Sequence, residues 1–196
     1  MGKKHQHKQG FGSRQVGGRQ KEVHFLIVSE DTKSSVSYFE AMIKDIQAIQ
    51  NSVVKEVSTQ EQPNDEHVGV SSETKVVGCG MAEKAGFEVA WSNESFELWY
   101  LLHFRYHNTA LGRKECPKAL EEEIRKYDPE FKYKKGSSDM YTVLSQHGDQ
   151  DQAIKHARKL RGNYTDNNYA KHNPCTRVDE LVKVLTDPEE RKKILG

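Results

Sequence analysis

The stretch SNESFELWYLLHF, residues 92–104, begins with polar residues and continues with apolar residues that would form one broad helix face. It follows a β-prone run at residues 87–91, and Ser92 and Asn93 are residue types that cap helices. Apolar residues then recur every three or four positions, which predicts a helix over residues 94–106. Glu97 falls in the apolar half of that helix. A strand, a polar turn and a helix with an acid at this point are typical of an α/β fold, whose ligands gather at strand ends.

The chain before this stretch predicts another strand and helix. Residues 23–28, VHFLIV, form the near-continuous apolar run of a buried parallel strand. Asp31 or Thr32 can cap the next helix, whose inner side is predicted to carry five apolar residues. These are Val36, Phe39, Met42, Ile43 and Ile46.

The middle of the chain is less regular. Residues 53–57 predict a second strand, and the polar residues 58–75 predict a loop. Residues 75–77 suit either a short strand or a helix start, and residues 82–85 predict a helix end before Gly86.

The rest of the chain predicts helices. They are expected at residues 116–127, 140–147, 151–161 and 176–185. The order, α/β first and helical afterwards, predicts a small, mostly parallel sheet flanked by helices, with a C-terminal helical elaboration.

Composition narrows the class of protein. At 196 residues the chain has the size of one domain, and 30% of its residues are charged. It has no apolar run long enough to span a membrane, and its basic N-terminus lacks the apolar core of a signal peptide. Cys79, Cys116 and Cys175 form no Cys-x-x-Cys pair, which indicates neither a zinc knuckle nor a disulfide scaffold. We therefore expect a cytoplasmic protein.

Residues 1–21 form a basic arm rich in Gly, Gln and His, ahead of a domain predicted over residues 22–196. That composition cannot build a packed core, so the arm is expected to be flexible. It is either a solvated tail or an arm that contacts the phosphates of nucleic acid. The cations that it would offer to phosphates are Lys3, Lys4, Lys8, Arg14 and Arg19.

Three segments in this order resemble the RloB-like family, which includes abortive-infection proteins of the AbiLii type. The central stretch fits the pattern Ser-Asn-x-x-Phe-Glu-Leu-Trp-x-Leu-Leu-His-Phe. Residues 28–39 are similar to the first strand and helix of the family, and residues 173–178 resemble its Asn-Pro-Ser-Thr-x-Val element. The resemblance spans about residues 20–187, which is most of the chain.

The resemblance implies a bacterial anti-phage protein, often encoded beside an ATPase partner. It also implies a Toprim-like core that uses acidic residues and Mg²⁺ for phosphodiester chemistry on DNA or RNA. Glu30 stands where such a core places its first catalytic and metal-binding acid, and Glu97 is the second candidate for both roles. Without the resemblance, Glu30 is an exposed loop acid and Glu97 a half-buried helix acid paired with Lys or Arg.

The Asp-x-Asp of a Toprim-like core is missing where the resemblance places it. The acids available there are Asp65, Glu66 and Glu73, in a polar segment without a buried strand to position them. The only Asp-x-Asp, residues 149–151, precedes an apolar periodic run and predicts a helix cap with first-turn acids. Two main hypotheses remain: a Mg²⁺-dependent nuclease, and a non-catalytic protein that binds an ATPase partner or nucleic acid. A weaker third is a plain nucleic-acid-binding module driven by the arm.

Four further residues are candidates for contacting phosphate. Lys134 and Lys135 belong to a basic loop, and Asn173 and Arg177 belong to the C-terminal motif. The structural alternative for that motif is that Pro174 keeps Asn173 out of the helical region while Thr176 caps the last helix.

A transition-metal site and an ATP-hydrolysing site are less well supported by the sequence. His103 and His107 have the spacing of a metal-binding pair, but the Glu of a His-Glu-x-x-His motif is absent, which favours a structural role. The chain also has no Gly-x-x-x-x-Gly-Lys-Ser/Thr, so it is not expected to hydrolyse ATP itself.

Overall fold

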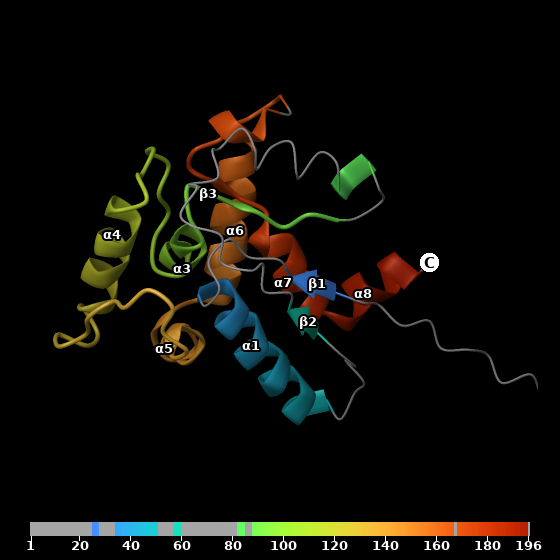
Figure 1. Ribbon diagram of the computed structural model, residues 1–196, viewed down its shortest axis with the longest axis horizontal. Coiled ribbons are helices and arrows are strands. Elements are labelled where there is room, and N and C mark those ends of the chain that lie inside the picture. The colour runs from blue at the N-terminus through green and yellow to red at the C-terminus, as the bar shows by residue number, and fades with distance from the viewer. Residues whose placement is uncertain are drawn as a thin grey trace, which may run out of the picture.

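The computed structural model describes residues 25–27, 34–50, 57–59, 82–84, 88–166 and 168–195. Most of these residues are helical, and Figure 1 shows the short helix α3 lying between α4 and α6. None of the helices in these ranges is both long and apolar enough to cross a membrane.

The helices and strands follow one another along the chain without a repeat. In order they are β1 (Phe25–Ile27), α1 (Ser34–Gln50), β2 (Val57–Thr59), β3 (Ser92–Asn93), α3 (Glu97–Leu102), α4 (Glu115–Ile124), α5 (Met140–His147), α6 (Gln150–Arg161), the 3-10 helix η1 (Tyr169–Lys171), β4 (Cys175–Thr176), α7 (Val178–Thr186) and α8 (Pro188–Leu195).

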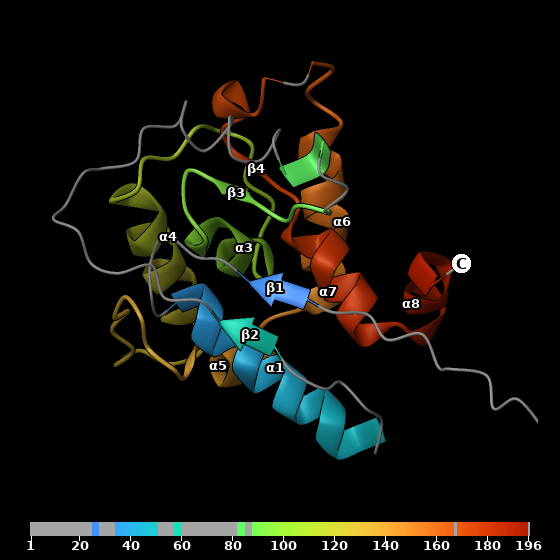
Figure 2. The ribbon, with the colours of Figure 1, turned by 45° about the vertical axis from the view of Figure 1, so that its right-hand side comes forward.

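The strands form two separate pairs. β1 lies parallel to β2, with Phe25 opposite Val57, and Figure 2 shows the two side by side. β3 lies antiparallel to β4, with Ser92 opposite Thr176. Within the described residues each sheet has only two strands. The structure there is mostly helical, and the larger, mostly parallel sheet that we predicted is not present.

The core is built around α3. All six residues of this helix are buried, which fits a sequence that is apolar on nearly every side. α3 packs against α4 and α6, and α1 packs against α5 and α7. The predicted inner side of α1 is confirmed at Phe39, Met42, Ile43 and Ile46, whereas Val36 is only partly buried. Burial of these side chains is the main force that holds the helices together.

Several helix predictions are confirmed. α5 has the predicted bounds, and α6 begins one residue before its predicted start. Asp149 caps α6, because its side chain accepts a 2.9 Å hydrogen bond from the backbone N–H of Gln152. The Asp-x-Asp at residues 149–151 is therefore a helix cap, as predicted.

The predicted boundaries around the central motif are wrong. Residues 88–91 are not a strand, and Ser92 and Asn93 form β3 instead of capping a helix. α3 covers residues 97–102, not 94–106. The last predicted helix starts at Val178, because Cys175 and Thr176 pair with β3. At β3 and β4, a backbone pairing between distant residues outweighs the local preference.

α8 was not predicted, because its sequence has little apolar periodicity. Pro188 suits the first turn of a helix, and Glu189 and Glu190 follow there. Lys192 and Lys193 form ion pairs with these two acids at a spacing of three residues. Local charge pairing therefore supports this helix, which also packs against α7.

Candidate functional site

Glu97 is a buried acid at the start of α3. The residue is 2% exposed, and its Oε1 accepts a 2.8 Å hydrogen bond from the Tyr133 hydroxyl. Among the described residues no Lys or Arg forms an ion pair with it. The partner of this carboxylate is thus a tyrosine hydroxyl, and the expected Lys or Arg is not found.

The loop that carries Tyr133 is fixed to three helices. The Tyr133 backbone N–H donates a 2.7 Å hydrogen bond to Glu121 of α4, and the Tyr133 hydroxyl reaches Glu97 of α3. The N–H of Gly136 donates a 3.0 Å hydrogen bond to Ser34 Oγ at the start of α1. Gly136 has a φ of 77°, a conformation that glycine adopts without strain. This loop therefore connects Glu97 to the first residue of α1.

α3 itself also contacts the start of α1. The hydroxyl of Tyr100, one helical turn after Glu97, donates a 2.9 Å hydrogen bond to the Ser34 carbonyl oxygen. Ser34 follows Glu30 by four positions in the sequence. Glu30 lies outside the described residues, as do Asp65, Glu66 and Glu73, so their predicted roles stay predictions.

Cys116 of α4 is a potential nucleophile whose thiol interacts electrostatically with Glu97. Burial, together with the negative charge of Glu97, raises the pKa of its thiol to about 12. The thiolate is the reactive form of cysteine, so this thiol is inert near neutral pH. Cys116 is therefore part of the packing between α3 and α4.

Lys134 and Lys135, which are predicted to contact phosphate, are exposed residues of the loop that covers Glu97. Their role with phosphate stays a prediction. The arm cations Lys3, Lys4, Lys8, Arg14 and Arg19 lie outside the described residues.

The described residues do not fit a magnesium site. Mg²⁺ binds oxygen ligands and keeps several waters, so its carboxylates must be accessible. Glu97 is buried, and its oxygen accepts the Tyr133 hydrogen bond. Across the part of the chain that the structure describes, no three His, Cys, Asp or Glu side chains gather closely enough to hold a metal ion. No reaction step is therefore assigned to magnesium on this geometry.

The histidine pair is also not a metal site. His103 is buried, and its Nδ1 donates a 3.0 Å hydrogen bond to the Trp99 carbonyl oxygen. Burial lowers the pKa of His103 to about 4, so the ring is neutral at physiological pH. α3 ends at Leu102, so His107 does not share a helix face with His103, and its Nδ1 lies 3.2 Å from Arg105. Both rings have structural contacts, as the sequence favoured.

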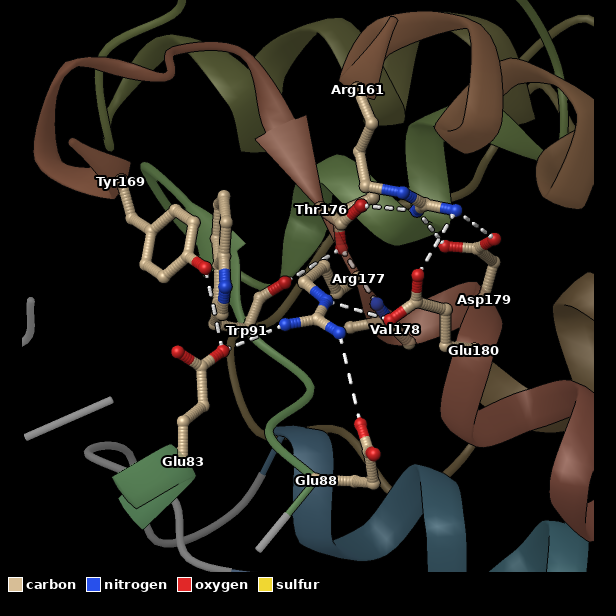
Figure 3. A network of polar contacts seen from close by, with 10 residues as sticks. All are labelled: Glu83, Glu88, Trp91, Arg161, Tyr169, Thr176, Arg177, Val178, Asp179 and Glu180. Atoms are coloured by element: carbon tan, nitrogen blue, oxygen red, sulfur yellow. Dashed lines mark hydrogen bonds and ion pairs between the residues drawn. The ribbon is translucent and has the colours of Figure 1, made fainter. Parts of the chain in front are cut away.

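Arg161 belongs to a network of ion pairs that joins α6, β4 and α7 (Figure 3). Both terminal nitrogens of its guanidinium donate to the carboxylate of Asp179, which is fully buried. One of them also donates a 2.8 Å hydrogen bond to the Thr176 carbonyl oxygen. Burial acts to lower the pKa of Arg161, but Asp179 outweighs it and the net shift is upward.

Arg177 lies in the same network, surrounded by carboxylates. Its side chain forms ion pairs with Glu83 at 2.8 Å and Glu180 at 2.6 Å, and lies 3.8 Å from Glu88. Figure 3 shows the three acids on different sides of the guanidinium. A phosphate at Arg177 would have to displace these acids. The predicted contact between Arg177 and phosphate is untested.

The two sequence motifs meet at the β3–β4 pair. The Asn93 side chain donates to the carbonyl oxygens of Tyr169, Ala170 and His172, at 3.3, 3.3 and 3.0 Å. Thr176 Oγ1 donates to the Trp91 carbonyl oxygen at 3.0 Å and accepts from the Val178 N–H at 3.2 Å. The motif residues thus join residues 91–93 to residues 169–178.

Asn173, the remaining candidate for contacting phosphate, lies just before this pair. Its side-chain nitrogen donates to the Leu111 carbonyl oxygen at 3.4 Å. Its side-chain oxygen is buried and has no partner among the described residues. Its contact with phosphate stays a prediction.

Sequence reasoning missed Tyr133 and the role of Asn93. Asn93 was part of the recognised motif, but the pattern pointed to a helix cap, not to a clamp on residues 169–172. Tyr133 carries no sequence signal at all, since the polar loop around it does not reveal which acid its hydroxyl reaches.

A protein-family model described as RloB-like protein matches residues 65–185. The match includes Glu97, both basic loop residues and the C-terminal motif, and it leaves out Glu30 and residues 1–21. No curated protein and no solved structure matches the chain.

Proposed function

Because the chain belongs to the RloB-like family, we propose that it is a component of a bacterial anti-phage, abortive-infection system that acts on DNA or RNA. The observation that carries this proposal is the position of Glu97. The carboxylate is held at the start of α3, and both its helix and its hydrogen-bonded loop contact Ser34. Ser34 begins the helix that follows β1, and it comes four positions after Glu30 in the sequence.

In the nuclease form of this proposal, the core is Toprim-like and acts with Mg²⁺. Glu30 and Glu97 would be the catalytic and metal-binding acids, with Glu97 released from its Tyr133 hydrogen bond. Asp65, Glu66 and Glu73 are the candidates that would replace the missing Asp-x-Asp. Lys134, Lys135, Asn173 and Arg177, with the basic arm, would contact the substrate. Because the described residues supply Glu97 alone, activity depends on acids from the rest of the chain.

The nuclease form is tested by cleavage of DNA and tRNA in Mg²⁺ and in Mn²⁺. The variants are Glu30→Gln and Glu97→Gln, with Glu122→Gln as the control, because Glu122 is an exposed acid of α4. We expect weak cleavage without a partner protein, abolished by Glu30→Gln and unchanged by Glu122→Gln. Cleavage that none of the three variants reduces would exclude Glu30 and Glu97 from the chemistry.

A second candidate is a non-catalytic protein that binds an ATPase partner or nucleic acid. The observation that favours it is that Glu97 is bonded to Tyr133 and buried, so no substrate or metal reaches it in this conformation. Co-expression with the ATPase that this candidate takes as its partner tests it. It predicts a stable complex, and no cleavage by the intact chain in either metal.

A further inference from the structure

Three exposed cations lie on one face of α6. Lys155, Arg158 and Lys159 are exposed, and their spacing of three and four residues puts them on the same side of the helix. None of the three has a carboxylate partner among the described residues. Arg161, one turn further along, is bound to Asp179. The outer face of α6, meaning these three residues, therefore presents unneutralised positive charge.

One of these cations is held in place by an aromatic ring. The Lys159 ammonium lies 4.3 Å from the centroid of the Tyr106 ring, in a cation–π contact. The Tyr106 hydroxyl accepts a 3.5 Å hydrogen bond from Asn163. The ring of His156 lies 5.6 Å from that of Tyr106. The position of Lys159 is thus partly fixed before any ligand binds, which reduces the ordering required on binding.

The helix beneath this face is anchored to the core. His156 Nδ1 donates a 2.9 Å hydrogen bond to the Leu102 carbonyl oxygen at the end of α3. Ala153, Ala157 and Leu160 are buried on the inner side of α6. The three cations consequently project from a rigid helix, and not from a mobile loop.

Helix stability accounts for only part of this arrangement. Cations near a helix C-terminus interact favourably with the helix dipole, which applies to Arg158 and Lys159 in the last turn. Lys155 lies before that turn, so the dipole does not explain it. Asp151, the one acid within α6, lies four residues before Lys155 on the same side of the helix, and no ion pair joins the two in the described structure.

We propose that the outer face of α6 binds the sugar–phosphate backbone of nucleic acid without reading its bases. The inference rests on the proposed function, since it takes nucleic acid to be the target. Lys155 and Lys159 are separated by one helical turn, about 6 Å along the axis. Phosphates of one duplex strand are spaced about 3.4 Å along the duplex axis, so two of them can meet this pair. Each such contact releases counterions and makes binding sensitive to salt.

The test measures binding of the full-length chain to a labelled DNA duplex and a labelled single-stranded RNA, by fluorescence anisotropy between about 50 and 200 mM KCl. The variant is Lys155→Gln, Arg158→Gln and Lys159→Gln combined. The control, Lys44→Gln, Lys114→Gln and Lys118→Gln combined, removes the same charge from exposed cations of other segments. We expect the slope of log K against log salt for the duplex to fall by roughly 2 to 3 in the variant alone.

A further variant keeps the charges and exchanges their side chains: Lys155→Arg, Arg158→Lys and Lys159→Arg combined. It should bind with the wild-type salt slope, and circular dichroism should show that all variants keep their helices. If the salt slope falls equally in the α6 variant and in its control, the inference is overturned and the proposed function still stands. A wild-type chain that binds neither probe overturns the inference and also removes nucleic acid as the proposed target.

Discussion

The hydroxyl of Tyr133 lies 2.8 Å from Oε1 of Glu97, and this contact joins residues that are 36 positions apart. A buried carboxylate must be satisfied by hydrogen bonds, because burial removes its water. Tyr133 supplies such a bond from a loop that is itself fixed to α1 and α4. The same contact keeps Glu97 away from solvent, so it links the stability of the fold to the accessibility of the candidate acid.

Replacing Tyr133 with Phe should lower the free energy of unfolding by about 1–3 kcal/mol, because the Glu97 carboxylate then loses its hydroxyl partner. Urea denaturation followed by circular dichroism measures the change. Tyr127→Phe is the matched control, since Tyr127 is 58% exposed. Equal stability of the two variants would mean that the hydrogen bond contributes nothing to the fold.

Replacing Arg161 with Met should be more destabilising, by about 3 kcal/mol or more, because it leaves the fully buried carboxylate of Asp179 without its cation. Guanidinium denaturation measures the loss. The control is Lys192→Met, which breaks an ion pair that is exposed on both sides and should change stability very little. A small effect at both sites would show that water reaches Asp179 once Arg161 is removed.

The stability of the protein should depend on His103 at acidic pH. Burial lowers the pKa of His103 to about 4, whereas the unfolded chain has a histidine pKa of about 6.5. The unfolded state therefore binds a proton first as the pH falls. Above about pH 6.5 the neutral His103 ring costs the folded state no stability. Between pH 6.5 and 4 the free energy of unfolding falls by roughly 3 kcal/mol on account of this residue.

The measurement is the free energy of unfolding of the wild type and of His103→Asn across that pH range. Asn keeps a side-chain N–H for the Trp99 carbonyl oxygen but does not titrate. The variant should therefore lose less stability on acidification, because all other titrating groups, including the nearby Asp149, are present in both proteins. Parallel curves for the two proteins would contradict the prediction.

Replacing Asn93 with Ala should free residues 169–172, because three carbonyl oxygens there lose their donor. We expect a loss of about 1–3 kcal/mol in stability and faster hydrogen exchange at these residues. Mass spectrometry of exchanged peptides measures the local effect. Asn108→Ala, at an exposed position, should leave that exchange unchanged.

Removing residues 1–21 should reduce the salt dependence of nucleic-acid binding. The arm contains six Lys or Arg residues. Each phosphate contact adds about −0.9 to the slope of log K against log salt for duplex DNA. Anisotropy titrations with and without the arm measure the difference. An unchanged slope would show that residues 1–21 are a solvated tail.

Local sequence patterns predicted the elements that local interactions determine. α5 and α6 follow from apolar periodicity, and the cap at Asp149 follows from residue type and position. The family was recognisable from the order of its motifs, and the match over residues 65–185 confirms it.

Long-range pairing set the limits of prediction. Ser92 and Asn93 have the chemistry of a helix cap, yet they form a strand because Cys175 and Thr176 lie opposite them. The partner of Glu97 was equally hidden, since nothing in the sequence around Tyr133 specifies a contact 36 positions away. The catalytic role of Glu30 and the phosphate contacts of the arm stay predictions, because these residues lie outside the described ranges.

The contact between Thr176 and Trp91 spans 85 positions, which has a consequence for how the chain folds during synthesis. Closing so long a loop costs more conformational entropy than winding a helix, so contacts within α4, α5 and α6 are expected first. On the ribosome, β3 has no strand to pair with until β4 emerges. Pairing of β3 with β4 is therefore a late step compared with the contacts within α4, α5 and α6.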